Sequence, residues 1–192
     1  MVKIIAGHWK GRRIKTTEGE GYRPAMGRTR EAVFSMLASR GVCWESARVL
    51  DVFAGSGSLG WEALSRGASE VCFLESDAKA LRLLREQALV FERPGQTIRV
   101  LAGDALRTLD KSPRQPGYEV LFFDPPYGRD ILVKAITLAT RHGWMAPDAL
   151  ICAEVEKQWT PSSLTHPELA LQTDRTYGQT RICIWTFEHG AT

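Results

Sequence analysis

The chain has 192 residues, of which 44% are hydrophobic and 24% charged, and its net charge is +3 at pH 7, as is ordinary for one globular domain with a sizeable core. No apolar run approaches the roughly 20 residues of a membrane-spanning helix, and Ile4 to Ala6 are too few for a signal peptide, so we expect a cytoplasmic protein without a membrane anchor. No two of the four cysteines form a C-x-x-C pair, so we expect reduced, structural cysteines and no bound metal.

The N-terminal segment is strongly basic. Residues 1–30 contain eight lysines and arginines and two acidic residues, whereas the rest of the chain contains 17 basic and 20 acidic residues. We expect a short strand over residues 3–7, followed by a basic turn over residues 8–13. The asymmetry favours a basic arm that binds phosphates, attached to a neutral or acidic body. A solvated terminal segment is the alternative.

From Thr29 the spacing of apolar residues predicts a helix, with Thr29 as its N-cap. Beyond this helix, apolar strand-like runs alternate with amphipathic segments. The predicted strands are 48–53, 71–75, 97–101, 118–123, 149–155, 169–173 and 181–187. The predicted helices are 58–66, one that Asp77 caps, a short one after Asp104, and 130–141.

This order of elements determines the expected fold class. Strands that alternate with helices form parallel sheets covered on both faces, and the last two strands, with no helix between them, pair as a hairpin. We expect an α/β protein with a Rossmann-like, doubly wound, mostly parallel seven-stranded sheet, an antiparallel C-terminal edge hairpin and a short basic N-terminal extension. Residues 1–192 are expected to be a single domain, with the arm at 1–30 and the catalytic core at 47–192.

A glycine-rich turn follows the strand at 48–53. Gly55, Gly57 and Gly60 allow the backbone to turn tightly and to approach a ligand closely. Glu75 ends the next strand, where its carboxylate can accept two ribose hydroxyls. Because the glycines fit G-x-G-x-x-G, an NAD-dependent dehydrogenase is an alternative.

Two aspartates separate these alternatives. Asp51 stands just before the turn, where its charge attracts an ammonium or sulfonium group but not a pyrophosphate. Asp104 follows the third strand, from which a side chain can reach an adenine edge. Both positions favour a cationic nucleoside cofactor over a dinucleotide.

The apolar strand at 118–123 runs directly into Asp124-Pro125-Pro126-Tyr127. The exocyclic amine of guanine or adenine is a poor nucleophile because its lone pair is delocalised into the ring. The Asp124 side chain and the Pro125 carbonyl can accept its two N–H groups, while the prolines fix the direction of the carbonyls. Tyr127 can stack on the base. Hydrogen bonds that strengthen as the amine becomes cationic lower the barrier, so the tetrad predicts methyl transfer to an amine.

Nearly the whole chain resembles one family. The matching segments are Ile4-Ile5-Ala6-Gly7, Lys10-Gly11-Arg12, Arg23-Pro24, Arg28, Arg30-Glu31, Phe34, Leu50 to Gly57, Leu59-Gly60, Glu62 to Ala68, Asp124 to Tyr127 and Tyr177-Gly178-Gln179-Thr180. They resemble the bacterial small-subunit ribosomal RNA guanine-N2 methyltransferases, the RsmD-like family of S-adenosylmethionine-dependent enzymes. The tetrad is shared with DNA adenine methylases, so the N-terminal segments carry the assignment to ribosomal RNA.

The resemblance implies a reaction and its residues. The reaction is methylation of the N2 amine of a guanine in small-subunit ribosomal RNA, in an assembled or assembling subunit, with the base taken out of its surroundings. The implied cofactor is S-adenosylmethionine, held by Asp51, Ala54, Gly55, Ser56, Gly57, Glu75, Asp104 and Ala105. The implied catalytic residues are Asp124, Pro125, Pro126 and Tyr127. The implied RNA-binding residues are Lys10, Arg12, Arg13, Arg28 and Arg30.

The chain departs from the family's pattern at Ala25-Met26-Gly27, where the family has threonines and an aspartate. This difference leaves open how the loop before the first helix is ordered. Three other functions also stay open: methylation of an amine in another RNA or in DNA adenine, an NAD-dependent dehydrogenase, and a non-catalytic RNA-binding domain. The dehydrogenase leaves the tetrad without a role, and the RNA-binding domain explains the basic arm alone.

Overall fold

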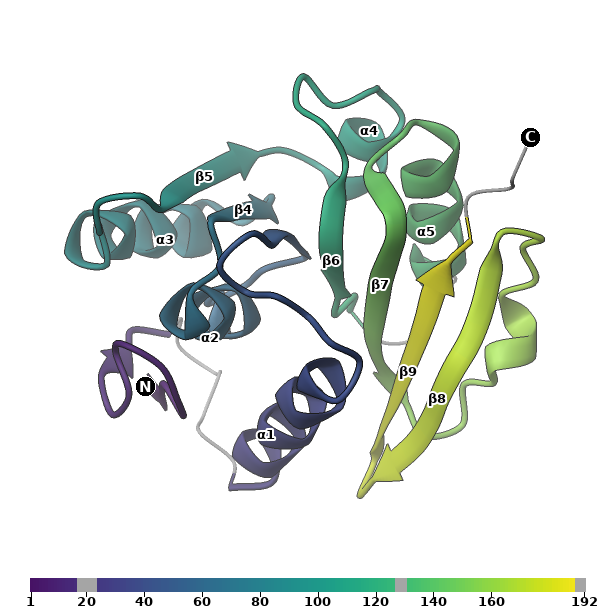
Figure 1. The fold of residues 1–192 in the computed structure, drawn as a ribbon, viewed down its shortest axis with the longest axis horizontal. Helices are drawn as coiled ribbons and strands as arrows, with labels where there is room; N and C mark the ends of the chain where they lie inside the picture. The colour runs from purple at the N-terminus through teal and green to yellow at the C-terminus, as the bar shows by residue number, and fades with distance from the viewer. Residues whose placement is uncertain (17–23, 127–130, 189–192) are drawn as a thin grey trace.

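The computed structural model describes residues 1–16, 24–126 and 131–188. Its main element is a seven-stranded sheet in the order β5-β4-β3-β6-β7-β9-β8 (Figure 1). The strands are β3 (Arg48–Val52), β4 (Glu70–Glu75), β5 (Thr97–Ala102), β6 (Tyr118–Phe123), β7 (Met145–Glu156), β8 (Leu169–Tyr177) and β9 (Thr180–Phe187). Strands β3 to β7 pair in parallel, and β9 pairs antiparallel with β7 and β8. The predicted mostly parallel sheet with an antiparallel C-terminal edge is confirmed.

Helices cover both faces of this sheet (Figure 1). They are α1 (Pro24–Ala38), α2 (Ser58–Arg66), α3 (Ala78–Val90), α4 (Ala105–Leu109) and α5 (Ile131–Arg141), with a 3₁₀ turn at Pro161–Ser163. Helices α1 to α3 pack on one face and α4 and α5 on the other. In β6, Phe122 belongs to the first core and Phe123 to the second, so the strand is apolar almost throughout. Within the described ranges, no helix is both long and apolar enough to cross a bilayer.

The order of strands reverses at the centre of the sheet. From β3 the chain extends outward through β4 and β5, and it then returns so that β6 lies on the other side of β3. Ligands of open α/β sheets bind outside the carboxyl ends of the strands at such a point of reversal. The topology therefore directs attention to the space between the glycine turn after β3 and the segment after β6.

Local sequence signals explain where α2 and α3 begin. Gly57 precedes α2 with a φ of 74°, in the left-handed region that favours glycine, and it supplies no capping side chain. Asp51 takes over this role, because its Oδ2 accepts a hydrogen bond from the Gly60 N–H at 2.9 Å. Asp77 caps α3 as predicted, accepting from two N–H groups of the first turn.

The first 16 residues fold onto the domain as a small hairpin. Its strands are β1 (Val2–Lys3) and β2 (Arg13–Ile14), which pair antiparallel. Ile4, Trp9 and Ile14 are buried in the same core as α1 and α2. These apolar side chains therefore anchor residues 1–16 of the basic segment to the core of the domain.

The hairpin approaches α2 through backbone contacts. A Cβ on Gly7, whose φ is 81°, would lie 1.8 Å from the Ser65 carbonyl oxygen. The Ile5 and Ala6 N–H groups donate to the two carboxylate oxygens of Glu62 at 2.7 and 3.0 Å. Only glycine at position 7 allows so close an approach.

Strands β7 and β8 are longer than predicted, since β7 begins at Met145 and β8 ends at Tyr177. Two boundaries near the N-terminus are also wrong. The described part of α1 begins at Pro24, so Thr29 lies inside the helix and is 5% exposed instead of capping it. The predicted strand over residues 3–7 ends at Lys3, because the chain then turns back and the Gly11 N–H donates to the Ile4 carbonyl.

Candidate active site

A cavity of about 360 Å³ lies at the carboxyl edge of the sheet, where the strand order reverses. The turn after β3, the end of β4, the segment after β6 and the end of β7 line it, together with residues of β1 and α1. The lining residues are Val2, Gly27, Arg30, Phe53, Ala54, Gly55, Ser56, Ser58, Leu59, Glu75, Ser76, Asp124, Pro126 and Glu154. The cavity thus brings together six of the predicted cofactor and catalytic residues: Ala54, Gly55, Ser56, Glu75, Asp124 and Pro126.

Hydrogen bonds hold the turn after β3. The Gly55 N–H donates to Glu75 Oε2 at 2.7 Å, and the Gly57 N–H donates to the Ala54 carbonyl at 2.6 Å. Phe53, which lines the cavity, has a φ of 61°. A bulky residue rarely adopts this conformation, and such strain gathers at ligand sites. No sequence pattern indicates this role of Phe53.

Glu75 is fixed by the backbone around it. Besides the bond from Gly55, its Oε1 accepts the N–H groups of Ser76 and Asp77 at 2.6 and 2.7 Å. A carboxylate offers about four acceptor positions, so three bonds hold its orientation and leave capacity for a ligand. A preorganised acceptor of this kind on the cavity wall suits a ribose hydroxyl.

Gly57 and Gly60 serve packing. A Cβ on Gly60 would lie 2.3 Å from the Phe73 ring, and one on Gly57 would lie 2.7 Å from the Leu84 side chain. Neither glycine is among the described residues that line the cavity. In the structure Gly57 lets α2 pack closely against β4, and its role in cofactor binding stays a prediction.

Asp51 lies beneath the turn, with 2% of its surface exposed. Burial raises the pKa of its carboxyl to about 7, opposed by the hydrogen bond from the Gly60 N–H and reinforced by the charge of Glu75. Asp51 is not among the described lining residues. In the structure Asp51 caps α2 near the positive end of the helix dipole. Its contact with a ligand's ammonium group stays a prediction.

Asp104 also has a local structural role. Its Oδ1 accepts the Arg107 N–H at 2.9 Å and so caps α4. It lines a different cavity, of about 800 Å³, while Ala105 is buried in the core. Both residues follow β5 as predicted, but the structure does not bring them to the wall of the cavity that holds Glu75 and Asp124.

The segment after β6 supplies an acidic group to the cavity. Asp124 and Pro126 line it, and Asp124 is exposed. The Asp124 N–H donates to the Val52 carbonyl of β3 at 3.5 Å, which ties the start of the segment to the sheet. Pro125 is buried. Tyr127 lies outside the described residues, so its stacking on a base stays a prediction.

Arg30 belongs to the cavity and not to an exposed surface. It is 6% exposed, its Nη2 donates to the Lys3 carbonyl at 2.5 Å, and its Nε lies 3.9 Å from Glu62 Oε2. Its side chain is directed inward, toward Glu62, and it lines the cavity from α1. Its contact with RNA phosphates stays a prediction.

Glu154, near the end of β7, is a lining residue that the sequence interpretation missed. Burial raises the pKa of its carboxyl, and a hydrogen bond with Thr180 lowers it. No motif marks this residue. Its place beside Asp124 follows only from the register of β7 against β6.

The other predicted RNA-binding residues are exposed: Lys10, Arg12, Arg13 and Arg28. Arg12 lies with its guanidinium carbon 5.5 Å from the centre of the Phe91 ring, and its Nη1 donates to the Val90 carbonyl at 3.4 Å. The hairpin therefore presents its charges beside the end of α3.

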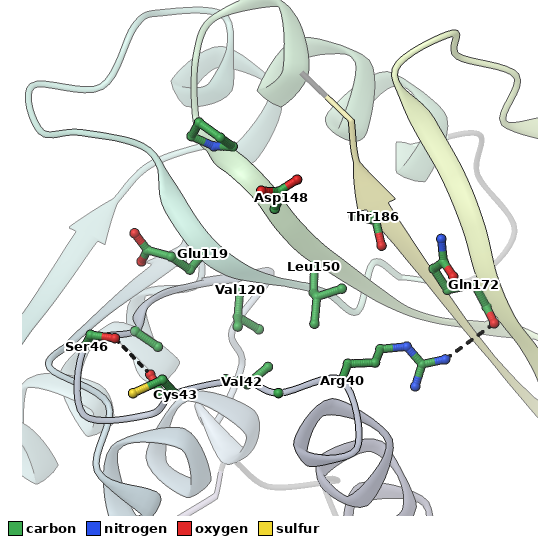
Figure 2. Close-up of a pocket in the computed structure, with 13 residues that line it drawn as sticks. Arg40, Val42, Cys43, Ser46, Glu119, Val120, Asp148, Leu150, Gln172 and Thr186 are labelled. Atoms are coloured by element: carbon green, nitrogen blue, oxygen red, sulfur yellow. Dashed lines mark hydrogen bonds between the residues drawn. The ribbon is translucent and has the colours of Figure 1, made fainter. Parts of the chain in front are cut away.

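A larger groove, of about 510 Å³, lies toward the amino ends of the strands (Figure 2). Figure 2 shows Arg40 extending from the loop after α1 toward Gln172, to whose carbonyl it donates. The same guanidinium donates to Thr173 Oγ1 at 2.5 Å. The groove contains none of the predicted site residues, and no group of three or more His, Cys, Asp or Glu in the described part of the chain could hold a metal ion. The cavity with Glu75 and Asp124 is the better candidate.

Known sequences resemble this chain over most of its length. The family described as conserved hypothetical protein 95 matches residues 2–186. Ribosomal RNA small subunit methyltransferase D of Haemophilus influenzae is 38% identical over 156 residues, which cover 81% of this chain and 79% of that protein. The protein of the same name from Escherichia coli is 37% identical over 157 residues, which cover 81% and 75%.

Solved structures give the same picture. A Haemophilus influenzae protein described as a methylase superposes with a TM-score of 0.81 at 32% identity, covering 98% of this chain and 99% of that one. Magnesium protoporphyrin IX methyltransferase from Synechocystis, solved with bound S-adenosylmethionine, has a TM-score of 0.68 at 13% identity over 88% of this chain and 87% of its own. The second likeness concerns the fold alone.

Proposed function

The chain belongs to the conserved hypothetical protein 95 family, and we propose that it is an enzyme that transfers a methyl group from S-adenosylmethionine to the N2 amine of a guanine in small-subunit ribosomal RNA. The curated relatives named ribosomal RNA small subunit methyltransferase D support the reaction class and the type of RNA. In the structure, one observation carries the proposal: the glycine turn, Glu75 and Asp124 line a single cavity.

The charge of the cavity fits the cofactor. Three carboxylates, those of Glu75, Asp124 and Glu154, line it together with one guanidinium, that of Arg30. This balance attracts a ligand with a net positive charge. S-adenosylmethionine has a sulfonium, an ammonium and a carboxylate, and when bound it supplies an electrophilic methyl group. Glu75 would accept from its ribose, and Arg30, which also contacts Glu62, would face its carboxylate.

Asp124 would prepare the nucleophile. Its carboxylate and the Pro125 carbonyl would each accept one N–H of the guanine amine and thereby turn the nitrogen lone pair toward the methyl group. The amine gains positive charge as it reacts, so hydrogen bonds to Asp124 strengthen in the transition state. Positioning of the nitrogen supplies much of the remaining acceleration. Tyr127 would stack on the base.

The RNA would be held outside this cavity. The exposed Lys10, Arg12, Arg13 and Arg28 would contact phosphates, and the target guanine would leave its stack to enter the cavity. An assembled or assembling small subunit is the proposed substrate. The proposed domain division is a single domain over 1–192, in which the basic segment 1–30 precedes the core at 47–192.

A thermal-shift experiment separates the proposal from a dehydrogenase. S-adenosylhomocysteine should raise the unfolding temperature, since a ligand that binds only the folded state stabilises it, and NAD should not. Stabilisation by NAD alone would contradict the proposal.

Methyl transfer tests the proposal directly. Small ribosomal subunits from a strain that lacks this gene are incubated with the enzyme and labelled S-adenosylmethionine, beside naked ribosomal RNA and DNA, and the labelled nucleosides are identified. We expect N2-methylguanosine from the subunits. Label in DNA alone would overturn the assignment to ribosomal RNA, while label in naked RNA but not in subunits would overturn the subunit as substrate.

A further inference from the structure

Glu154 occupies the position next to Asp124 on the neighbouring strand. Strands β6 and β7 are parallel, and Phe123 pairs with Ala153, so Asp124 and Glu154 each follow this pair at the carboxyl edge. Both residues line the cavity.

The two residues also continue the same face of the sheet. Phe122 and Cys152, two positions earlier in each strand, belong to the core beneath α1. Side chains of a strand alternate between faces, so Asp124 and Glu154 extend this face beyond the core. A planar base whose amine meets Asp124 would therefore have its adjoining edge near Glu154.

The surroundings of Glu154 favour a hydrogen-bond donor as its partner. The residue is half-buried, and burial raises the pKa of its carboxyl. Thr180, at the start of β9, makes a hydrogen bond with it. Thr180 ends the segment Tyr177-Gly178-Gln179-Thr180, one of the segments that carry the resemblance to the methyltransferase family. A carboxylate removed from water in this way is stabilised when a ligand N–H donates to it.

Guanine and adenine differ at the atom that adjoins the amine. In guanine the N2 amine neighbours N1–H, which is a donor, whereas in adenine the N6 amine neighbours an unprotonated N1, which is an acceptor. We propose that Glu154 accepts the N1–H of the target guanine and thereby makes this enzyme select guanine over adenine. This inference rests on the proposed function. It explains how an Asp-Pro-Pro-Tyr segment that also suits adenine is restricted to guanine.

The variant Glu154→Gln tests this role. A glutamine keeps the size of the side chain, accepts N1–H less strongly, and can turn its amide N–H toward an adenine N1. The substrates are subunits that carry either the natural guanine, located by the methyl-transfer experiment above, or adenine at that position. The readouts are kcat/KM for each substrate, the identity of the methylated nucleoside, and the affinity for S-adenosylhomocysteine.

For Glu154→Gln we expect kcat/KM on guanine to fall about 10- to 100-fold, since one charge-assisted hydrogen bond is weakened. The guanine-to-adenine ratio should fall at least about tenfold, with N6-methyladenosine appearing and the affinity for S-adenosylhomocysteine unchanged. Thr180→Val should lower the ratio less, because Thr180 only positions Glu154. The control is Glu156→Gln, which changes a half-buried carboxylate of the same strand. Glu156 does not line the cavity, so the guanine-to-adenine ratio should stay unchanged.

An unchanged ratio in a folded Glu154→Gln variant would overturn the inference, as would a loss confined to the affinity for S-adenosylhomocysteine. In both cases methylation of guanine by the unaltered enzyme would leave the proposed function intact. If the unaltered enzyme methylates no guanine, the proposed function fails and this inference fails with it.

Discussion

The two halves of the cavity wall are built differently. In the half formed by β3, β4 and α2, backbone groups and close packing dominate: Glu75 accepts three N–H groups, and Gly60 has no room for a side chain. In the half formed by β6 and β7, the side chains of Asp124 and Glu154 are directed at the cavity from adjacent strand ends. Substitutions in the first half should therefore weaken folding, and substitutions in the second should weaken catalysis.

The largest effect is expected in the second half. Asp124→Ala removes the acceptor for the reacting amine, and we expect kcat to fall by about 10²- to 10³-fold. The unfolding temperature and the affinity for S-adenosylhomocysteine should stay close to those of the unaltered protein, because Asp124 is exposed. Steady-state methyl transfer, thermal unfolding and titration with S-adenosylhomocysteine measure these three quantities. A variant with normal turnover would remove Asp124 from the catalytic residues.

A glycine of the first half should show the opposite behaviour. In Gly60→Ala the new Cβ would meet the Phe73 ring at 2.3 Å and Val71 at 2.8 Å, so we expect a loss of about 3 kcal/mol in the free energy of unfolding. Denaturant unfolding measures it. Gly103→Ala is the control, since its Cβ meets only the Thr108 hydroxyl, at 3.0 Å. Equal stability of the two variants would show that α2 tolerates displacement from β4.

The buried charge of the first half should appear as a pH dependence. Asp51 has its pKa raised from 3.8 to about 7, mainly by burial, so its contribution to stability is complete below pH 3.8 and is lost as the pH rises through 7. Asp51→Asn should remove this loss and reduce the decline in stability between pH 5 and pH 8 by roughly 2 kcal/mol. If the stability of the unaltered protein and that of Asp51→Asn changed with pH in the same way, this would contradict the burial of a charge at position 51.

The smallest effect is expected for the N-terminal hairpin, which lies outside both halves of the cavity wall. Replacing Lys10 and Arg13 with alanine should weaken RNA binding and lower the salt dependence of the affinity by about one unit of log–log slope per residue. Arg12 is left in place because it also packs on Phe91. The control is Lys134→Ala, on α5 at the opposite face of the sheet. A salt dependence equal to that of the unaltered protein would place the RNA elsewhere.

The sequence predicted the architecture well because strands and helices have different hydrophobic periods. Helix α2 and strand β6 have the predicted ends, and Asp77 caps α3. Thr29 was misplaced because threonine is a frequent cap, whereas here tertiary packing buries it within α1.

The site was predictable only where a motif follows a strand end. The glycine turn, Glu75 and Asp124 meet in the cavity because the carboxyl ends of parallel strands share one edge. Asp104 satisfies the same rule but uses its carboxylate to cap α4. The places of Arg30 and Glu154 on the cavity wall could not be predicted from sequence, since they depend on an ion pair with α2 and on the register of β7.

In the proposed reaction, the cavity of about 360 Å³ holds both the cofactor and the reacting base. A crystal structure with S-adenosylhomocysteine tests it most directly, because larger cavities elsewhere in the described part of the chain are competing sites. We predict that the ligand lies between Glu75 and Asp124, with its sulfur directed toward Asp124. Density in the groove beside Arg40, or in the cavity beside Asp104 and away from Glu75, would contradict this account.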